Sequence, residues 1–366
     1  MRGYRILWTV AVASTLATGF TVVARAEDTR APLQRALDQL VAAGAPGALA
    51  EVTADGVTWR GTSGLAELGA SRPVPAHGRF RIGSVTKAFV ATVVMQLVAE
   101  GRLCLDDPVG RWLPGILPPG GERITLRHLL NHTSGLYNYT DELPLRDPAR
   151  LMAIRFQTWN PWELLRLATA HPLLFEPGTR WRYSNTGDIV LGLIIEKVTG
   201  RPYGAEIERR IVRALGLNNT STPSTATSLA DPHAHGYLPL MDANGPRLVD
   251  ITEFNPSAAW AAGEMVSTAA DLNRFIGALL RGRLVDGHHL RAMTAVTSPA
   301  EDYGLGITLI HLPCGTVYGH DGDFPGYSTW TFATLDARRR ITVSVTWGTG
   351  QPRDVSALLT GALCAA

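Results

Sequence analysis

The chain has 366 residues, of which 45% are hydrophobic and 18% are charged, and its formal net charge is +2. This length and composition supply enough apolar residues for one large or two modest globular domains. The near-neutral charge and the lack of a dense Lys/Arg run give no electrostatic reason to expect nucleic acid as a partner.

The N-terminal segment has the pattern of a secretory signal. Arg2 and Arg5 precede an apolar run over residues 6–23, and a small-x-small triplet follows at residues 24–26. We therefore predict a signal peptide over residues 1–26 and a secreted protein without a stable membrane anchor after cleavage. The alternative is an uncleaved anchor, because the apolar run approaches the roughly 20 residues that span a bilayer.

The following segments predict the start of a sheet and a buried helix. A short helix is expected over residues 32–43, and two strands then meet at Asp55-Gly56, a dipeptide typical of β-hairpin turns. From residue 84 to residue 98 the chain is apolar almost all round a helix. Such a pattern indicates a helix in the centre of the protein.

The rest of the chain divides into a helical part and a strand-rich part. Residues 102–250 are rich in proline, tryptophan and helical stretches, and we interpret them as a mostly helical lobe. The segments GTVYGHDG, YSTWTFATL and ITVSVTWG predict three consecutive antiparallel strands, followed by a final helix. The expected fold is α+β: an antiparallel sheet from both chain ends (residues 27–101 and 251–366), flanked by helices, with the helical lobe inserted. An active site would lie in the cleft between the lobes.

A serine and a lysine stand at the start of the predicted central helix. The chain has only two lysines, and one of them, Lys87, follows Ser84 by three residues in RIGSVTK. Helix positions i and i+3 are neighbours. A serine hydroxyl needs a base to take its proton, and burial lowers the pKa of a lysine so that its neutral amine can be that base. The helix N-terminus would favour a developing oxyanion at Ser84.

The S-x-x-K pair alone is a weak signal, because Ser84 could instead cap the helix while Lys87 reaches solvent. Two further motifs accompany it. Tyr183-Ser184-Asn185 lies in a loop that leads into a predicted helix, and His320-Asp321-Gly322 ends a predicted strand.

Together and in this order, the three motifs resemble those of the serine penicillin-recognising hydrolases. The likeness is to the β-lactamase-related branch that holds secreted D-alanyl-D-alanine carboxypeptidases, class C β-lactamases and related esterases, with motifs S-x-x-K, Y-x-N and H/K-x-G. It extends over most of residues 35–364 and is nearest to the actinobacterial-type secreted carboxypeptidases. The resemblance implies a β-lactamase/transpeptidase-like fold.

The resemblance also implies a role for each matching residue. Ser84 would be the acylated nucleophile, and Lys87 and Tyr183 would share the transfer of its proton. Asn185 would orient the substrate amide. His320 would line the opposite wall of the cleft and join the same proton network.

Further residues complete the expected site. The backbone N–H groups of Ser84 and Asp323, next to Gly322, would form the oxyanion hole. Trp260 is predicted to wall the cleft, although a packed core aromatic is an equal alternative on general grounds. His132, in NHTSG, is interpreted as a turn or helix-capping residue.

Export permits disulfides, and the chain has three cysteines. Sequence alone does not determine their connectivity. We favour a Cys314–Cys364 bridge, with Cys104 as a buried free thiol. The resembled carboxypeptidases likewise carry one cysteine shortly before the histidine motif and another in the last helix.

No metal is predicted, because the histidine pairs at 233/235 and 288/289 lack a third ligand at a recognisable spacing. A serine hydrolase of the resembled family is expected to need no cofactor. One feature departs from a carboxypeptidase. Asp321 and Asp323 stand where threonine-like residues would suit a substrate carboxylate, and both would share one face of a regular strand.

The favoured function is therefore a secreted serine hydrolase that acts on D-Ala-D-Ala stem peptides of peptidoglycan and reacts with β-lactams, and we expect a monomer. An esterase or a D-amino-acid amidase or aminopeptidase of the same family is the first alternative. A catalytically idle module that binds peptidoglycan or a partner is the alternative of another class.

Overall fold

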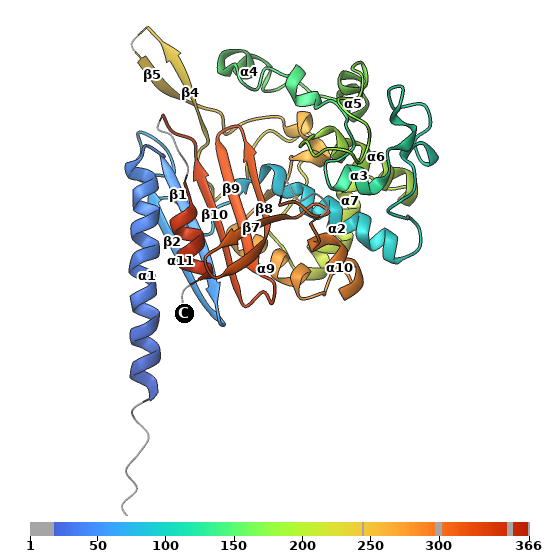
Figure 1. Ribbon diagram of the computed structural model, residues 1–366. Coiled ribbons are helices and arrows are strands. Elements are labelled where there is room, and N and C mark those ends of the chain that lie inside the picture. Colours follow the sequence, from blue (N-terminus) through green and yellow to red (C-terminus); the bar gives the residue numbers. More distant parts are fainter. Residues whose placement is uncertain (1–17, 244, 297–301, 350–353, 365–366) are drawn as a thin grey trace, which may run out of the picture.

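The computed structural model describes residues 18–243, 245–296, 302–349 and 354–364 (Figure 1). Its centre is a six-stranded antiparallel sheet in the order β2-β1-β10-β9-β8-β7. The strands are β1 (Gly47–Ala54), β2 (Val57–Gly64), β7 (Thr308–Leu312), β8 (Gly315–Phe324), β9 (Tyr327–Thr334) and β10 (Arg339–Thr346). The predicted α+β fold, with an antiparallel sheet from both chain ends, is confirmed.

The predicted hairpin turn lies between β1 and β2. Asp55 and Gly56 have φ values of 48° and 87°, as the two central residues of a type I′ turn require. Ala54 pairs with Val57 across this turn.

One face of the sheet is covered by the two terminal helices, α1 (Thr18–Ala42) and α11 (Ser356–Leu363) (Figure 1). Leu33 and Leu37 of α1 pack with Leu358 of α11 on sheet residues such as Val343 and Phe332. The helix expected over residues 32–43 thus starts earlier, at Thr18, and the predicted cleavage site at residues 24–26 falls inside it. Residues 1–17 lie outside the described part. None of the described helices is long and apolar enough to cross a membrane.

The opposite face is covered by α2 (Thr86–Ala99) and α9 (Ala269–Leu280), which belong to the largest apolar cluster. Phe89 of α2 stacks on Phe275 of α9 with ring centroids 3.7 Å apart. As the apolar pattern predicts, α2 is buried on nearly all sides.

The segment between α2 and α9 carries most of the remaining helices. The predicted helical stretch also contains a β-hairpin, which projects beyond one end of the sheet (Figure 1). The elements are α3 (Leu126–Leu130), α4 (Pro148–Ile154), α5 (Pro161–Thr169), α6 (Thr186–Thr199), α7 (Tyr203–Ile207), α8 (Arg213–Leu215) and the hairpin of β4 (Tyr237–Asp242) and β5 (Gly245–Asp250). A small ladder pairs β3 (Phe80–Arg81) with β6 (Val266–Ser267), and α10 (Gly287–Thr294) follows α9.

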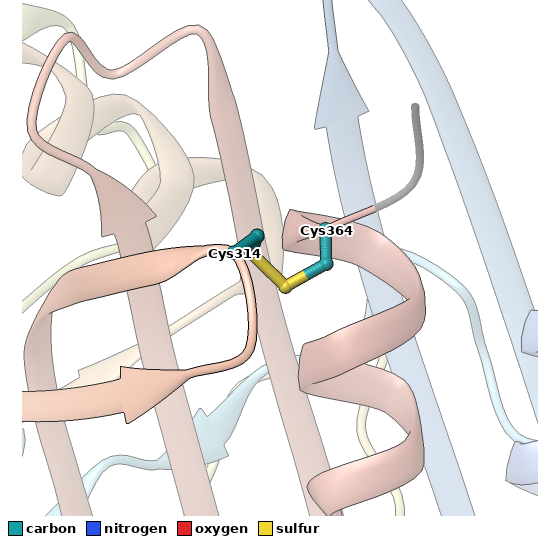
Figure 2. Close-up of a disulfide and its surroundings, with 2 residues drawn as sticks. All are labelled: Cys314 and Cys364. Atoms are coloured by element: carbon teal, nitrogen blue, oxygen red, sulfur yellow. A yellow bond between two sulfur atoms is a disulfide. The ribbon is translucent and has the colours of Figure 1, made fainter.

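The structure forms the favoured disulfide. Cys314, in the turn between β7 and β8, bonds to Cys364 at the end of α11, and their Cα atoms are 5.4 Å apart (Figure 2). Cys104 is a free thiol, but the expectation that it is buried is wrong. Leu103 and Leu105 on either side of it are buried, but Cys104 opens a turn, in which the N–H of Asp107 donates to the Cys104 carbonyl oxygen, and its side chain faces solvent.

Candidate active site

Ser84 lies where β3 passes into α2. Gly83–Val85 forms a single 3-10 turn, and the α-helix proper begins at Thr86. The Ser84 side chain makes no capping hydrogen bond to this helix and instead faces Lys87 and Tyr183. The Lys87 side chain is 1% exposed. The alternative of a capping serine beside a solvated lysine is therefore excluded.

Three oxygen atoms surround the Lys87 amine. Nζ donates hydrogen bonds to the carbonyl oxygen of Ala262 at 2.6 Å and to Oδ1 of Asn185 at 2.8 Å, and it lies 3.1 Å from Oγ of Ser84. The first two oxygens can only accept, so they occupy two N–H groups in either charge state. The position that faces Ser84 then holds a proton in the ammonium form and a lone pair in the neutral amine.

Burial lowers the pKa of Lys87 to about 8, against the opposing effect of Asp188 and Asp321. An appreciable fraction of the amine is therefore neutral near pH 8. In that form its lone pair can accept the Ser84 proton, as the sequence led us to expect.

Tyr183 lies on the other side of the Ser84 oxygen. Its hydroxyl donates a hydrogen bond to Oγ of Ser84 at 2.8 Å. Burial, followed by the nearby Asp188, raises the pKa of Tyr183 well above its usual value, so the phenol carries its proton at neutral pH. The arrangement can pass a proton from Ser84 to Lys87 and deliver another from Tyr183 to a leaving group.

Asn185 holds the lysine. Besides accepting from Lys87, it donates from its backbone N–H and from Nδ2 to Oδ1 of Asn138, at 3.0 and 3.3 Å. Asn185 also lines the cleft, and its predicted contact with a substrate amide stays a prediction.

His320 lies on β8, is 2% exposed and lines the cleft. Its Nε2 is 2.8 Å from the hydroxyl of Tyr303, and its Nδ1 faces the carbonyl oxygen of Asp321. Among the described residues, the only hydrogen bond between this imidazole and another side chain is the one to Tyr303. A proton network shared directly with the nucleophile would require a hydrogen bond to Ser84 instead. Burial lowers the pKa of His320, which favours the neutral ring.

The expected oxyanion hole rests on a close approach between β8 and the turn at Ser84. A Cβ atom on Gly322 would lie 2.2 Å from the carbonyl oxygen of Ile82 and 2.7 Å from the backbone nitrogen of Ser84. The two-residue turn of the β8–β9 hairpin makes Phe324–Tyr327 the closing hydrogen-bonded pair, so the next pair along, at Asp323, directs its N–H away from β9. The N–H groups of Ser84 and Asp323 can therefore face one substrate oxygen.

These residues border a cleft of about 660 Å³ between the sheet edge and the helical lobe. Asp321 and Asp323 are both exposed on one face of β8, which stays regular through Gly322. Trp260 is not among the lining residues. Its ring packs against Gly192 and lies 4.6 Å from the ring of Tyr203, so the prediction that it walls the cleft is wrong.

Two residues close to the site make contacts that the sequence analysis did not predict. Arg81, fully buried, donates to the carbonyl oxygens of Thr227 and Phe254 at 2.7 and 2.9 Å and so ties the strand before Ser84 to the lobe. His132, interpreted as a turn residue, has a φ of 58°, and its ring lies 4.3 Å from that of Tyr183. The sequence NHTSG was the only indication of a position near the site, and the same sequence is also typical of a turn.

The geometry of this site indicates the class of enzyme, and similarity to known proteins then indicates the protein family. A serine oxygen between a buried lysine and a phenol, next to the backbone N–H groups of Ser84 and Asp323, is the arrangement that a serine hydrolase requires. The chain belongs to the beta-lactamase family, whose pattern matches residues 33–363. That family consists of serine hydrolases.

Individual relatives carry different activities. The chain is 31% identical over 301 residues to Penicillin-binding protein 4* of Bacillus subtilis (76% of this chain, 63% of that protein). It is 34% identical over 261 residues to Esterase EstB of Burkholderia gladioli (64% and 65%). The match thus spans just under two thirds of each of these relatives.

Among solved structures, a D-stereospecific amidohydrolase from Streptomyces sp. superposes with a TM-score of 0.84. It is 39% identical, and the match covers 92% of this chain and 98% of that one.

Proposed function

We propose that the protein is an amidohydrolase or esterase that forms an acyl-enzyme at Ser84 and acts on D-amino-acid amides, peptides or esters without a free carboxylate beside the scissile bond. The observation that carries the proposal is the position of Oγ of Ser84, 3.1 Å from Nζ of Lys87 and 2.8 Å from the hydroxyl of Tyr183. We include export of the protein, on the N-terminal signal pattern, as a further part of the proposal.

The reaction follows from these contacts. Oγ of Ser84 attacks the substrate carbonyl and its proton passes to the neutral amine of Lys87, while the oxyanion is held by the N–H groups of Ser84 and Asp323. The C–N or C–O bond breaks, and the departing amine or alcohol takes the hydroxyl proton of Tyr183. The proton held by Lys87 then replaces the one that Tyr183 has lost. Water then attacks the acyl-serine, releases the acid and returns the proton to Ser84.

The charge of the cleft supports the restriction on the leaving group. Three carboxyl side chains line it, from Asp302, Asp321 and Asp323, and no arginine or lysine is among the described lining residues. Asp321, whose side chain is 55% exposed, would repel a substrate carboxylate, whereas a neutral amide, an ester or an ammonium group would be accepted. The D-configuration is supported by the similarity to the Streptomyces amidohydrolase.

D-alanyl-D-alanine carboxypeptidase activity is the second candidate. The similarity to Penicillin-binding protein 4* favours it. It would require the C-terminal carboxylate of the peptide to be bound close to Asp321 and Asp323.

The two candidates differ in their response to the double substitution Asp321→Thr and Asp323→Thr. We expect the wild-type enzyme to hydrolyse D-phenylalanine amide faster than its L-enantiomer and faster than a D-Ala-D-Ala peptide. In the double variant, kcat/KM for the D-Ala-D-Ala peptide should rise about fivefold relative to that for a neutral p-nitrophenyl ester, because the repulsion between Asp321 and the substrate carboxylate, about 1 kcal/mol, is removed. An unchanged ratio would contradict the charge argument, and a wild-type preference for the peptide would favour the carboxypeptidase.

A further inference from the structure

A buried carboxyl group lies beside Lys87 and has no place in the reaction described so far. Asp188, in the first turn of α6, is 4% exposed. Its Oδ2 atom is 3.9 Å from Nζ of Lys87, and neither side chain is more than 6% exposed. The first turn of a helix favours a negative charge at this position.

No hydrogen bond joins the two groups. The three directions of the Lys87 ammonium are taken by Ser84, Asn185 and Ala262, and within the described part of the chain Oδ2 of Asp188 has no hydrogen-bond partner. A buried carboxylate oxygen without a donor is costly, and burial raises the pKa of Asp188 to about 7, against the opposing effect of Lys87. Above about pH 7 Asp188 is therefore mainly the carboxylate, and the charge of Lys87 is its compensation. The interaction is electrostatic and does not depend on the hydrogen bonds of the lysine.

The other titratable groups that face this pair do not offer the same buried negative charge. Burial lowers the pKa of His132, on the loop after α3, and of His320, on β8, so both rings are neutral near pH 7. Asp321, also on β8, is 55% exposed at its side chain and therefore screened by water. Burial raises the pKa of the surrounding phenols, which stay neutral: Tyr139, Tyr183 and Tyr303.

We propose that Asp188 is the electrostatic partner of Lys87: its carboxylate stabilises the ammonium that forms when Lys87 takes the Ser84 proton, and it determines the pH range in which that amine is free to act. This inference rests on the proposed function, in which Lys87 is the base. Asp188 is a positioning residue, because it acts on the nucleophile only through Lys87.

Removing the charge has a definite sign. A neighbouring carboxylate raises the pKa of an ammonium group, so Asp188→Asn lowers the pKa of Lys87 and leaves more neutral amine at a given pH. The rising limb of kcat/KM against pH should therefore move to lower pH in the variant. Its plateau should fall, about tenfold, because the ammonium formed during acylation loses its compensating charge.

The lysine content of the chain allows Lys87 to be titrated directly. Protein labelled with lysine carrying ¹³C at Cε will give two resonances, from buried Lys87 and exposed Lys197, and Lys197→Arg identifies them. We expect the wild-type Lys87 resonance to titrate at about pH 8. In Asp188→Asn its midpoint should fall by about one pH unit or more, with Lys197 unchanged. Asp188→Val, an apolar replacement for a buried helix position, is measured as well in case the asparagine variant does not fold.

Each outcome decides the inference. Lower midpoints for Lys87 together with a rising limb displaced by the same amount support it. A Lys87 midpoint equal to that of the wild type overturns it, and so does a lower midpoint with an unchanged pH profile of ester hydrolysis. Failure of the proposed function is a different result, namely wild-type protein whose hydrolysis does not depend on Ser84, and the titration can be measured in either case.

Discussion

At the scale of single residues, the chemistry depends on how few hydrogen-bonding positions are left open around Lys87. Ala262 and Asn185 each accept one of its N–H groups, and this directs the third position toward Ser84. Burial brings the pKa of Lys87 to about 8, where loss of a proton converts that position from donor to acceptor. The same residue thus fixes the geometry and supplies the base.

Tyr183 should contribute to turnover rather than to binding. Tyr183→Phe removes the hydroxyl that donates to Oγ of Ser84 at 2.8 Å. Because proton transfer by a positioned side chain contributes about 10²–10⁴-fold, we expect kcat to fall by that range and KM to change little. Steady-state kinetics on a p-nitrophenyl ester measures both constants.

The matched control is Tyr137→Phe. That hydroxyl bonds to Glu142 at the surface, so its removal should leave kcat unchanged. Full kcat in the Tyr183 variant would remove Tyr183 from the proton path.

The sequence was informative about residues whose motif is short and local. Ser84, Lys87, Tyr183 and Asn185 were predicted together, and the structure brings them to hydrogen-bonding distance. The wrong prediction for Trp260 has a physical origin. A tryptophan close to a site in the sequence can pack in the core or line a cleft, and in the structure this ring packs against Gly192.

At the scale of elements, the site is made by a backbone contact between β8 and the turn that precedes α2. Gly83, with a φ of 51°, and Gly322 have no side chains where the two segments meet. A Cβ on Gly83 would lie 2.4 Å from the carbonyl oxygen of Asp323. Both positions therefore require glycine, because the two backbone segments approach so closely. The oxyanion hole depends on this approach.

Gly322→Ala should separate the two segments. The new Cβ would lie 2.2 Å from the oxygen of Ile82, a backbone atom that cannot rotate away. We expect kcat/KM to fall about 100-fold, as when one oxyanion donor is lost. Gly110→Ala, with open space around its Cβ, is the control and should keep wild-type kcat/KM. Equal activity of the two variants would show that the contact is not needed.

The disulfide joins the β7–β8 turn to α11 across 50 residues of sequence. Closing a loop of this size stabilises a protein by roughly 4 kcal/mol in the chain-entropy account. The double variant Cys314→Ser and Cys364→Ser should therefore lose about that much free energy of unfolding in urea denaturation. Cys104→Ser, at an exposed free thiol, should change it by less than about 0.5 kcal/mol. A double variant as stable as the wild type would contradict a structural role for the bridge.

Local patterns predicted the hairpin at Asp55-Gly56, the buried helix α2 and the strands β8, β9 and β10. They missed the hairpin of β4 and β5 in the segment interpreted as mostly helical. In β4 the exposed Met241 is an apolar residue on the solvent side, so the alternation expected of a half-buried strand is weak there.

At the scale of the whole molecule, the cleft gathers segments that lie far apart in the chain. Ser84 comes from the first quarter, Tyr183 from the helical lobe and Asp323 from the C-terminal sheet, and all three line one cavity. The sequence predicts the motifs, but it does not predict the distances between their side chains in the folded protein. Asp188 shows why, because its effect depends on a 3.9 Å approach to Lys87 that no spacing rule encodes.

The central claim is that Ser84 becomes acylated, and the most direct test is the intact mass after brief incubation with the methyl ester of benzylpenicillin, a β-lactam antibiotic in a form that has no free carboxylate. We predict an added mass equal to that of this ester on the wild-type protein and none on Ser84→Ala, with Cys104→Ser as a second control that still forms the adduct. Persistence of the adduct for hours would indicate slow deacylation, as in a peptidase. If the wild-type protein forms no adduct and a neutral ester is hydrolysed equally by wild type and Ser84→Ala, the acyl-enzyme account is contradicted, and the idle binding module becomes the better description.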